Sequence, residues 1–158
     1  MPLIELTTLI NAPIERCFDL ARSIDLHKLS TRGTAEDAIA GVTSGLIGEG
    51  EMVTWRATHF GITQTLTSKV TRLEYPYHFR DIMIKGAFKV IKHDHLFEVS
   101  GGWTVMKDEF YFESPGWILG VLFNKIILER YLRALLISRN KMIKETAEGD
   151  GWKTILKM

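Results

Sequence analysis

The sequence predicts an α+β fold in which a curved antiparallel sheet of about seven strands is wrapped on a long C-terminal helix, with two short helices after the first strand. Two observations lead to this prediction. Segments with the composition of strands, separated by short turns, follow one another from residue 38 to residue 113. The stretch from Ser114 to Gly149 then has no proline after Pro115 and becomes helical in its spacing. An antiparallel sheet has one face to bury, so this helix is expected to cover it.

The N-terminal segment predicts one strand followed by two short helices. Leu3–Ile10 is rich in Leu, Ile and Thr and ends before Pro13. Proline is tolerated in the first turn of a helix, so Pro13 can open one. The apolar residues that would share one face of this helix are Ile14, Cys17, Phe18 and Ala21. Residues 24–29 predict one or two further helical turns, and residues 31–36 give no clear prediction.

Six more strands are expected, separated by turns that contain Gly or Pro. They cover residues 38–42, 51–59, 62–74, 78–85, 88–99 and 103–113. Gly101-Gly102 is a hairpin signal between the last two. The Gly-rich connection over residues 43–50 lacks the Lys-Ser/Thr ending of a P-loop and does not open a helix, so we expect no phosphate site there.

The last expected element is a long helix. Ser114 and Pro115 form its start signal and Gly149 its stop signal. The second half, from Leu128 onward, is amphipathic, whereas Trp117–Ile127 is apolar nearly all round and needs cover on every side. Arg139 lies within the apolar stripe of the second half. Two interpretations of Arg139 stay open: its guanidinium reaches solvent at the edge of the stripe, or it is a counter-ion facing an internal cavity.

Composition narrows the class of protein. The 158 residues are expected to form one ligand-binding domain over residues 1–158, and a net charge of +1 gives no global field that would favour nucleic acid or an anionic membrane. Cys17 is the only cysteine, which excludes an internal disulfide and fits a reducing compartment. The chain shows no signal-peptide pattern and no apolar run of about 18 residues. We therefore expect a cytoplasmic protein without an integral membrane segment.

Period-two alternation places polar side chains on the sheet face that the helix covers. In residues 103–113, Asp108 alternates with Met106 and Phe110, and in residues 88–99 two histidines alternate with apolar residues. The same rule puts Val99 inside, while the register of residues 78–85 is ambiguous. The predicted lining is mainly apolar with polar groups embedded in it: Trp55, His59, Phe79, Asp81, His93, His95, Phe97, Asp108, Phe110, Leu135 and Arg139, with Gln64 as a further candidate.

Three interpretations of the internal polar group stay open. In the first, each Asp accepts a hydrogen bond from a His, and the network has no chemical role. In the second, His59, His93 and His95 bind Zn²⁺, but an H-x-H pair is weakly specific, so we assign no metal and expect no cofactor. In the third, a histidine oriented by Asp108 or Asp81 acts as a general base. Acyl transfer through a serine has no support in the sequence.

Several local motifs, taken with the order of elements, carry a resemblance to a known superfamily. They are Ile10-Asn11-Ala12-Pro13, Gly48-Glu49-Gly50, and residues 55–61, 77–81, 85–88, 93–97 and 128–131. Together they resemble the START-like or SRPBCC superfamily, also called the helix-grip fold, and specifically its bacterial polyketide cyclase/dehydrase-like branch. The resemblance implies a hydrophobic tunnel between sheet and long helix, shared by lipid carriers, hormone receptors, coenzyme Q-binding proteins and aromatase/cyclases. With one Cys, the chain does not look like a complete Rieske-type oxygenase.

The leading expectation is therefore binding or transport of a hydrophobic or amphipathic small molecule, such as a lipid, a quinone or a polyketide-like compound, between sheet and helix. The alternative is a polyketide cyclase/dehydratase-type enzyme that uses the internal His/Asp cluster. A third hypothesis is an interaction protein in which Trp117–Ile127 packs against a partner or against a second copy in a homodimer. The sequence does not identify the ligand.

Overall fold

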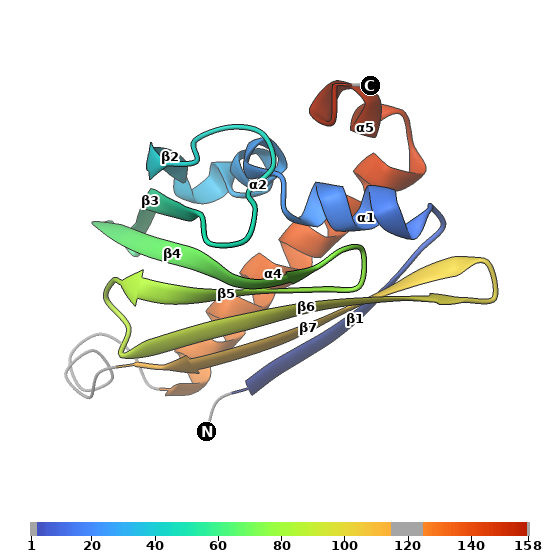
Figure 1. The fold of residues 1–158 in the computed structure, drawn as a ribbon. Helices are drawn as coiled ribbons and strands as arrows, with labels where there is room; N and C mark the ends of the chain where they lie inside the picture. Colours follow the sequence, from blue (N-terminus) through green and yellow to red (C-terminus); the bar gives the residue numbers. More distant parts are fainter. Residues whose placement is uncertain (1–2, 115–124, 158) are drawn as a thin grey trace.

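A computed structural model describes residues 3–114 and 125–157 of the chain (Figure 1). Its elements follow in the order β1 (Leu3–Ile10), α1 (Ile14–Ala21), α2 (Ile24–Ser30), the 3-10 helix η1 (Arg32–Thr34), β2 (Asp37–Gly41), β3 (Met52–His59), β4 (Ile62–Glu74), β5 (His78–Lys85), β6 (Val90–Ser100), β7 (Trp103–Glu113), α4 (Lys125–Glu148) and α5 (Gly151–Ile155). None of the helices in the described residues is both long enough and apolar enough to cross a lipid bilayer.

The seven strands form one antiparallel sheet in the order β1-β7-β6-β5-β4-β3-β2. Consecutive strands from β2 to β7 are neighbours, and β1 pairs with β7 to complete the other edge. Helix α4 runs along one face of the sheet, and α1 and α2 pack against α4 at one end of it (Figure 1). The predicted α+β fold with a long C-terminal helix is therefore confirmed.

Most element boundaries agree within two residues with those predicted from the sequence. The exceptions concern the long C-terminal helix and the residues that follow it. Residues 115–124, which hold most of the all-round apolar segment, lie outside the described residues, so their packing stays a prediction. Ile126 and Ile127, at the described end of that segment, are exposed and not covered as expected. Helix α4 ends at Glu148, directly before the expected stop at Gly149. The short helix α5 was not expected. Its Trp152 packs against the core, and the Arg16 guanidinium lies 3.9 Å from the ring centre of Trp152.

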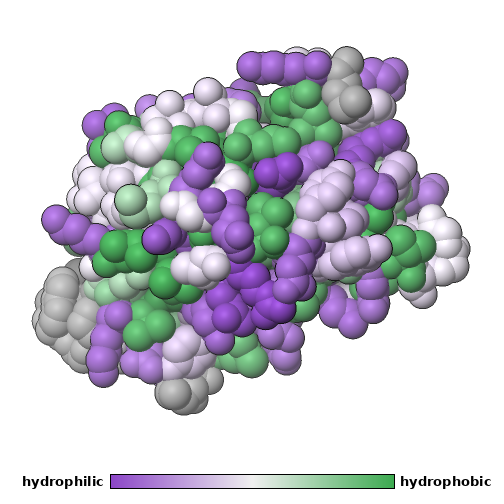
Figure 2. Space-filling view, viewed as in Figure 1, coloured by the Kyte–Doolittle hydropathy of each residue, from purple (hydrophilic) through white to green (hydrophobic). Residues whose placement is uncertain are grey.

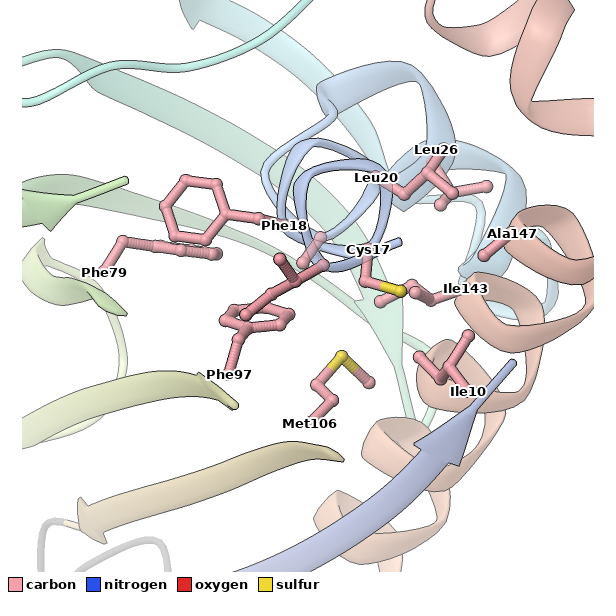
Figure 3. Close-up of a cluster of buried hydrophobic side chains, with 12 residues drawn as sticks. Ile10, Cys17, Phe18, Leu20, Leu26, Phe79, Phe97, Met106, Ile143 and Ala147 are labelled. Carbon is pink, nitrogen blue, oxygen red and sulfur yellow. The ribbon is translucent and has the colours of Figure 1, made fainter. Parts of the chain in front are cut away.

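The largest core cluster joins α1 to the sheet and to α4, as Figure 3 shows. Phe18 projects from α1 and makes edge contacts with Phe79 and Phe97, at 5.3 Å between ring centres in both cases. Ile143 and Ala147 of α4 close the cluster from the other side. Amphipathic spacing predicted this face of α1, because a short helix contributes to stability chiefly by burying its apolar stripe.

Phe97 and Val99 do not lie where the sequence predicted. Phe97 belongs to the core cluster around Phe18 and does not line the cavity described below. Val99 is 63% exposed because the β6–β7 hairpin extends past the layer of helices (Figure 1). Alternation predicts which face a side chain occupies, but it does not predict how far along a strand that face stays covered.

The face of the molecule shown in Figure 2 carries both hydrophobic and hydrophilic residues. Hydrophobic groups are interrupted by hydrophilic ones across this face, in the orientation of Figure 1. Exposed apolar residues are common on folded proteins and need no special explanation when they are scattered.

Cys17 is expected to resist alkylation in the folded protein. Its side chain is fully buried, and burial raises the pKa of the thiol to about 11. Since the thiolate is the reactive form, iodoacetamide at neutral pH should leave the native chain unmodified, whereas the chain unfolded in urea should react fully. Intact mass spectrometry measures both. Rapid modification of the native chain would show that α1 opens readily.

Candidate ligand cavity

A cavity lies between the inner face of the sheet, α2 and α4. Its volume is about 250 Å³, near the lower end of the range of roughly 300–1,000 Å³ typical of small-molecule sites. Trp55, Leu66, Phe110, Leu132 and Leu135 are among the residues that form its mostly apolar wall. A group of polar side chains from β5, β6 and α4 is set into this wall.

His93 is the best-defined member of that group. It lies on β6 opposite Phe110 of β7, yet its ring reaches diagonally to Asp108, and Nε2 donates a hydrogen bond of 2.7 Å to Oδ1 of that carboxylate. A carboxylate can only accept, so Nε2 carries the proton and Nδ1 holds the lone pair. Nδ1 has no hydrogen-bond partner among the described residues. His93 thus presents a neutral, oriented imidazole at the cavity wall.

His95 uses a different acid. Its Nε2 lies 2.9 Å from Oδ2 of Asp81 on the neighbouring strand β5. Its Nδ1 lies 3.4 Å from a guanidinium nitrogen of Arg139 on α4. The two imidazole rings are themselves only 3.7 Å apart between centres. Two His–Asp pairs therefore lie side by side at one place in the wall.

Arg139 and Asn140, both on α4, link this cluster to α4 and α1 by hydrogen bonds. Arg139 donates to the main-chain oxygen of Ala21, at 3.0 Å, and to the side-chain oxygen of Asn140, at 3.1 Å. Asn140 in turn donates to Oδ2 of Asp108, at 2.7 Å. Arg139 is buried, so of the two interpretations left open the internal counter-ion is correct, and its nearest nitrogen lies 3.6 Å from Asp108.

The charges of the cluster follow from burial and these contacts. Burial, helped by the neighbouring His95, lowers the pKa of His93 to about 4, so its imidazole is neutral near pH 7. Burial alone would raise the pKa of Asp108, but the hydrogen bond from His93, the nearby His95 and the charge of Arg139 hold it well below its ordinary range. The pKa of Asp81 is lowered in the same way, chiefly by the hydrogen bond from His95. Both carboxyls are therefore ionised.

His59 lies apart from this cluster. Its Nδ1 shares a hydrogen bond of 2.6 Å with the hydroxyl oxygen of Tyr131, and this bond joins the end of β3 to α4. Phe60 contacts the same Tyr131 ring, with 4.5 Å between centres. The three-histidine grouping considered from the sequence is therefore wrong, and among the described residues the third potential ligand beside His93 and His95 is Asp81.

Of the residues predicted to line the cavity, all but Phe97 and Asp108 do so. Asp108 is fully buried behind His93, where it orients the imidazole rather than facing the cavity. The ambiguous register of β5 is resolved with Phe79, Asp81 and Met83 inward. Gln64 lines a smaller neighbouring pocket.

Sequence reasoning missed two contributions to this site. The first comes from residues 24–36, since Ile24, His27 and Glu36 line the cavity, and the short helix predicted over residues 24–29 was not assigned to it. The second is Asn140, a buried amide beside Arg139. Its position four residues after Leu136, in line with the apolar stripe, was a usable signal.

No family model and no curated protein matches the chain significantly. Solved structures do match. Protein CV1439 from Chromobacterium violaceum aligns with a TM-score of 0.71 at 12% identity, over 94% of this chain and 98% of that one. The ginseng major latex-like protein 151 from Panax ginseng aligns with a TM-score of 0.66 at 14% identity, over 94% and 98%. The di-domain ARO/CYC StfQ from the steffimycin biosynthetic pathway aligns with a TM-score of 0.72 at 13% identity, over 94% of this chain and 51% of StfQ.

The chain has the helix-grip fold that these solved structures share. The fold implied by the sequence resemblance is therefore confirmed. At 12–14% identity the likeness concerns the fold, and the helix-grip fold carries several unrelated activities, so the function has to be argued from the site.

Proposed function

We propose that residues 1–158 act as one ligand-binding domain that takes up a hydrophobic or amphipathic small molecule, such as a lipid, a quinone or a polyketide-like compound, between the sheet and α4. The observation that carries this proposal is the cavity itself: a space of about 250 Å³ with mostly apolar walls and one polar cluster. Burial of apolar ligand surface there is worth about 25 cal/mol per Å². His93, His95, Asp81 and Arg139 are the groups able to orient a polar end.

The direct test is native mass spectrometry of freshly purified protein, compared with its denatured mass and followed by analysis of an organic extract. A retained organic molecule would support the proposal and identify the ligand class. If the protein carries nothing and takes up no lipid, quinone or polyketide-like compound offered to it, the proposal fails.

Filling the cavity should weaken binding without unfolding the protein. Leu135 lines the cavity from α4, and Leu135→Trp adds an indole to that space. We expect the affinity for the amphipathic fluorophore ANS to fall at least tenfold, or about 1.4 kcal/mol. Fluorescence titration measures this, with a thermal melt to show that the variant is folded.

The matched control for this experiment is Ile137→Trp. Ile137 lies on the same helix, is 50% exposed and does not line the cavity. It should bind ANS as the unchanged protein does. Equal affinity in both variants would mean that ANS binds outside the cavity.

A second candidate function is cyclisation or dehydration of such a molecule, with His93 as general base. The observation in its favour is the hydrogen bond from Nε2 to Asp108, which leaves Nδ1 as the free base. A pKa of about 4 makes His93 a weak base at neutral pH, so binding remains the better-supported function. In His93→Asn, a carrier keeps most of its affinity, whereas an enzyme loses kcat far more than affinity.

A further inference from the structure

We propose that Asp81, His93 and His95 form a binding site for a divalent transition-metal ion such as Zn²⁺. Each residue offers one donor atom, and the three atoms lie within 4.8 Å of one another. Metal–ligand distances of about 2.0–2.2 Å allow neighbouring ligand atoms to be up to about 4 Å apart, so small side-chain rotations are enough to close the site. This inference goes beyond the binding of a hydrophobic molecule and does not depend on it.

The backbone holds the three residues in place. His93 and His95 are two apart on β6 and so share the inner face, and Asp81 pairs directly with His93 across β5 and β6. All three come from the middle of a continuous sheet rather than from loops. A site on such elements requires little reorganisation when it binds a ligand.

The hydrogen bonding of His93 suits a metal ligand. Histidine binds a metal as the neutral imidazole, and its other ring nitrogen usually donates to a carboxylate or a carbonyl group. Nε2 of His93 already donates to Asp108 at 2.7 Å, so Nδ1 is the nitrogen that remains for a metal. Asp108 is itself held by Asn140 at 2.7 Å, which fixes the orientation of the imidazole.

His95 requires one proton to move. The metal would take the place of the proton between Nε2 of His95 and Oδ2 of Asp81, which are 2.9 Å apart. Nδ1 of His95 would then carry the ring proton toward Oδ1 of Asp108, at 3.5 Å, and Arg139 would give up its 3.4 Å contact with Nδ1 while keeping its hydrogen bonds to Ala21 and Asn140.

The local charge is favourable for a cation. The cluster contains two carboxylates, Asp81 and Asp108, and one guanidinium, that of Arg139. The guanidinium is also directed to Ala21 and Asn140 by hydrogen bonds of 3.0 and 3.1 Å. A divalent ion at Asp81 would therefore have more carboxylates than guanidinium groups around it in this cluster.

The donor set selects the kind of metal. Two imidazole nitrogens and one carboxylate oxygen suit Zn²⁺, Co²⁺, Ni²⁺ or Fe²⁺, whereas Mg²⁺ and Ca²⁺ prefer oxygen ligands alone. Three protein ligands leave at least one coordination position open. All three residues line the cavity, so water or the polar end of a small molecule could occupy that position.

The test uses zinc alone, without any hydrophobic ligand. Protein stripped with a chelator is mixed with excess Zn²⁺, desalted and assayed for metal by elemental analysis, and Co²⁺ is titrated separately by its visible absorption. We expect one equivalent of zinc to be retained. Asp81→Asn and His95→Asn should each weaken binding by at least about 100-fold, and Asp108→Asn by roughly 10–100-fold through the orientation of His93.

The matched control is His78→Asn. His78 is also a buried histidine bonded to an aspartate, with Nε2 at 2.7 Å from Asp94, but it does not line the cavity. This variant should keep one equivalent of zinc, and circular dichroism shows whether each variant is folded. The proposal is overturned if the unchanged protein retains no zinc, or if folded Asp81→Asn and His95→Asn bind zinc as tightly as it does. Because hydrophobic ligands are absent, either result leaves the proposed binding function intact.

Discussion

Replacing Asp108 by alanine is expected to lower the free energy of unfolding by about 3–5 kcal/mol. Asp108 is 1% exposed and accepts hydrogen bonds from His93 and Asn140, both of 2.7 Å. It is also the buried carboxylate nearest to the Arg139 guanidinium, at 3.6 Å. Removal of the carboxylate would leave a buried positive charge and two donors without their acceptor. Urea unfolding measures the change.

Two variants make this experiment decisive. Glu109→Ala changes the next residue of β7, which is on the exposed side of the strand, and should alter stability by no more than about 0.5 kcal/mol. Asp108→Asn keeps an acceptor for His93 but removes the charge, so its loss should be smaller than that of Asp108→Ala. A loss below about 1 kcal/mol for Asp108→Ala would mean that the network contributes little to the folded state.

Phe18→Ala should also lower the free energy of unfolding by about 3–5 kcal/mol, but for a different reason. Phe18 is fully buried at the centre of the cluster in Figure 3, where its ring contacts those of Phe79 and Phe97. Truncation to alanine removes apolar contacts and leaves a cavity between α1 and the sheet that close-packed neighbours can only partly fill. The midpoint of urea unfolding should fall without a change in its slope.

Ile84→Ala serves as the comparison for Phe18→Ala. Ile84 is 52% exposed, so its truncation should change stability much less. If Phe18→Ala proves as mild as Ile84→Ala, α1 does not depend on Phe18 for its attachment to the sheet. Neither residue lines the cavity, so both variants should still bind ANS if they are folded.

The strands could be predicted because their signals are local. A period of two, interrupted at Gly101-Gly102 and at Pro76, fixes both the boundaries and the inward face of most strands. The same rule predicted that His93, His95 and Asp108 point inward. It was wrong for Val99, because coverage at the end of a strand depends on where the helices stop. Helix α5 was missed since a five-residue helix has too few residues to show a period.

The polar cluster was predicted in composition but not in connectivity. Across a strand pair, a long side chain can reach the residue directly opposite or a diagonal one, and these alternatives look the same in sequence. His95 lies opposite Asp108 but has its shorter contact, 2.9 Å, with Asp81. His93 lies opposite Phe110 and reaches Asp108. The twist of the sheet and the packing of α4 select between these partners.

The sequence by itself determined the α+β class, the order of the elements and the presence of acids and imidazoles inside an apolar sheet face, since all of these follow from local periodicity. Only the tertiary structure decided that Arg139 is an internal counter-ion, that His59 bonds to Tyr131 and that Asp81 joins His93 and His95. These outcomes depend on distances between residues far apart in the chain, which the docking of α4 sets. No local pattern encodes them.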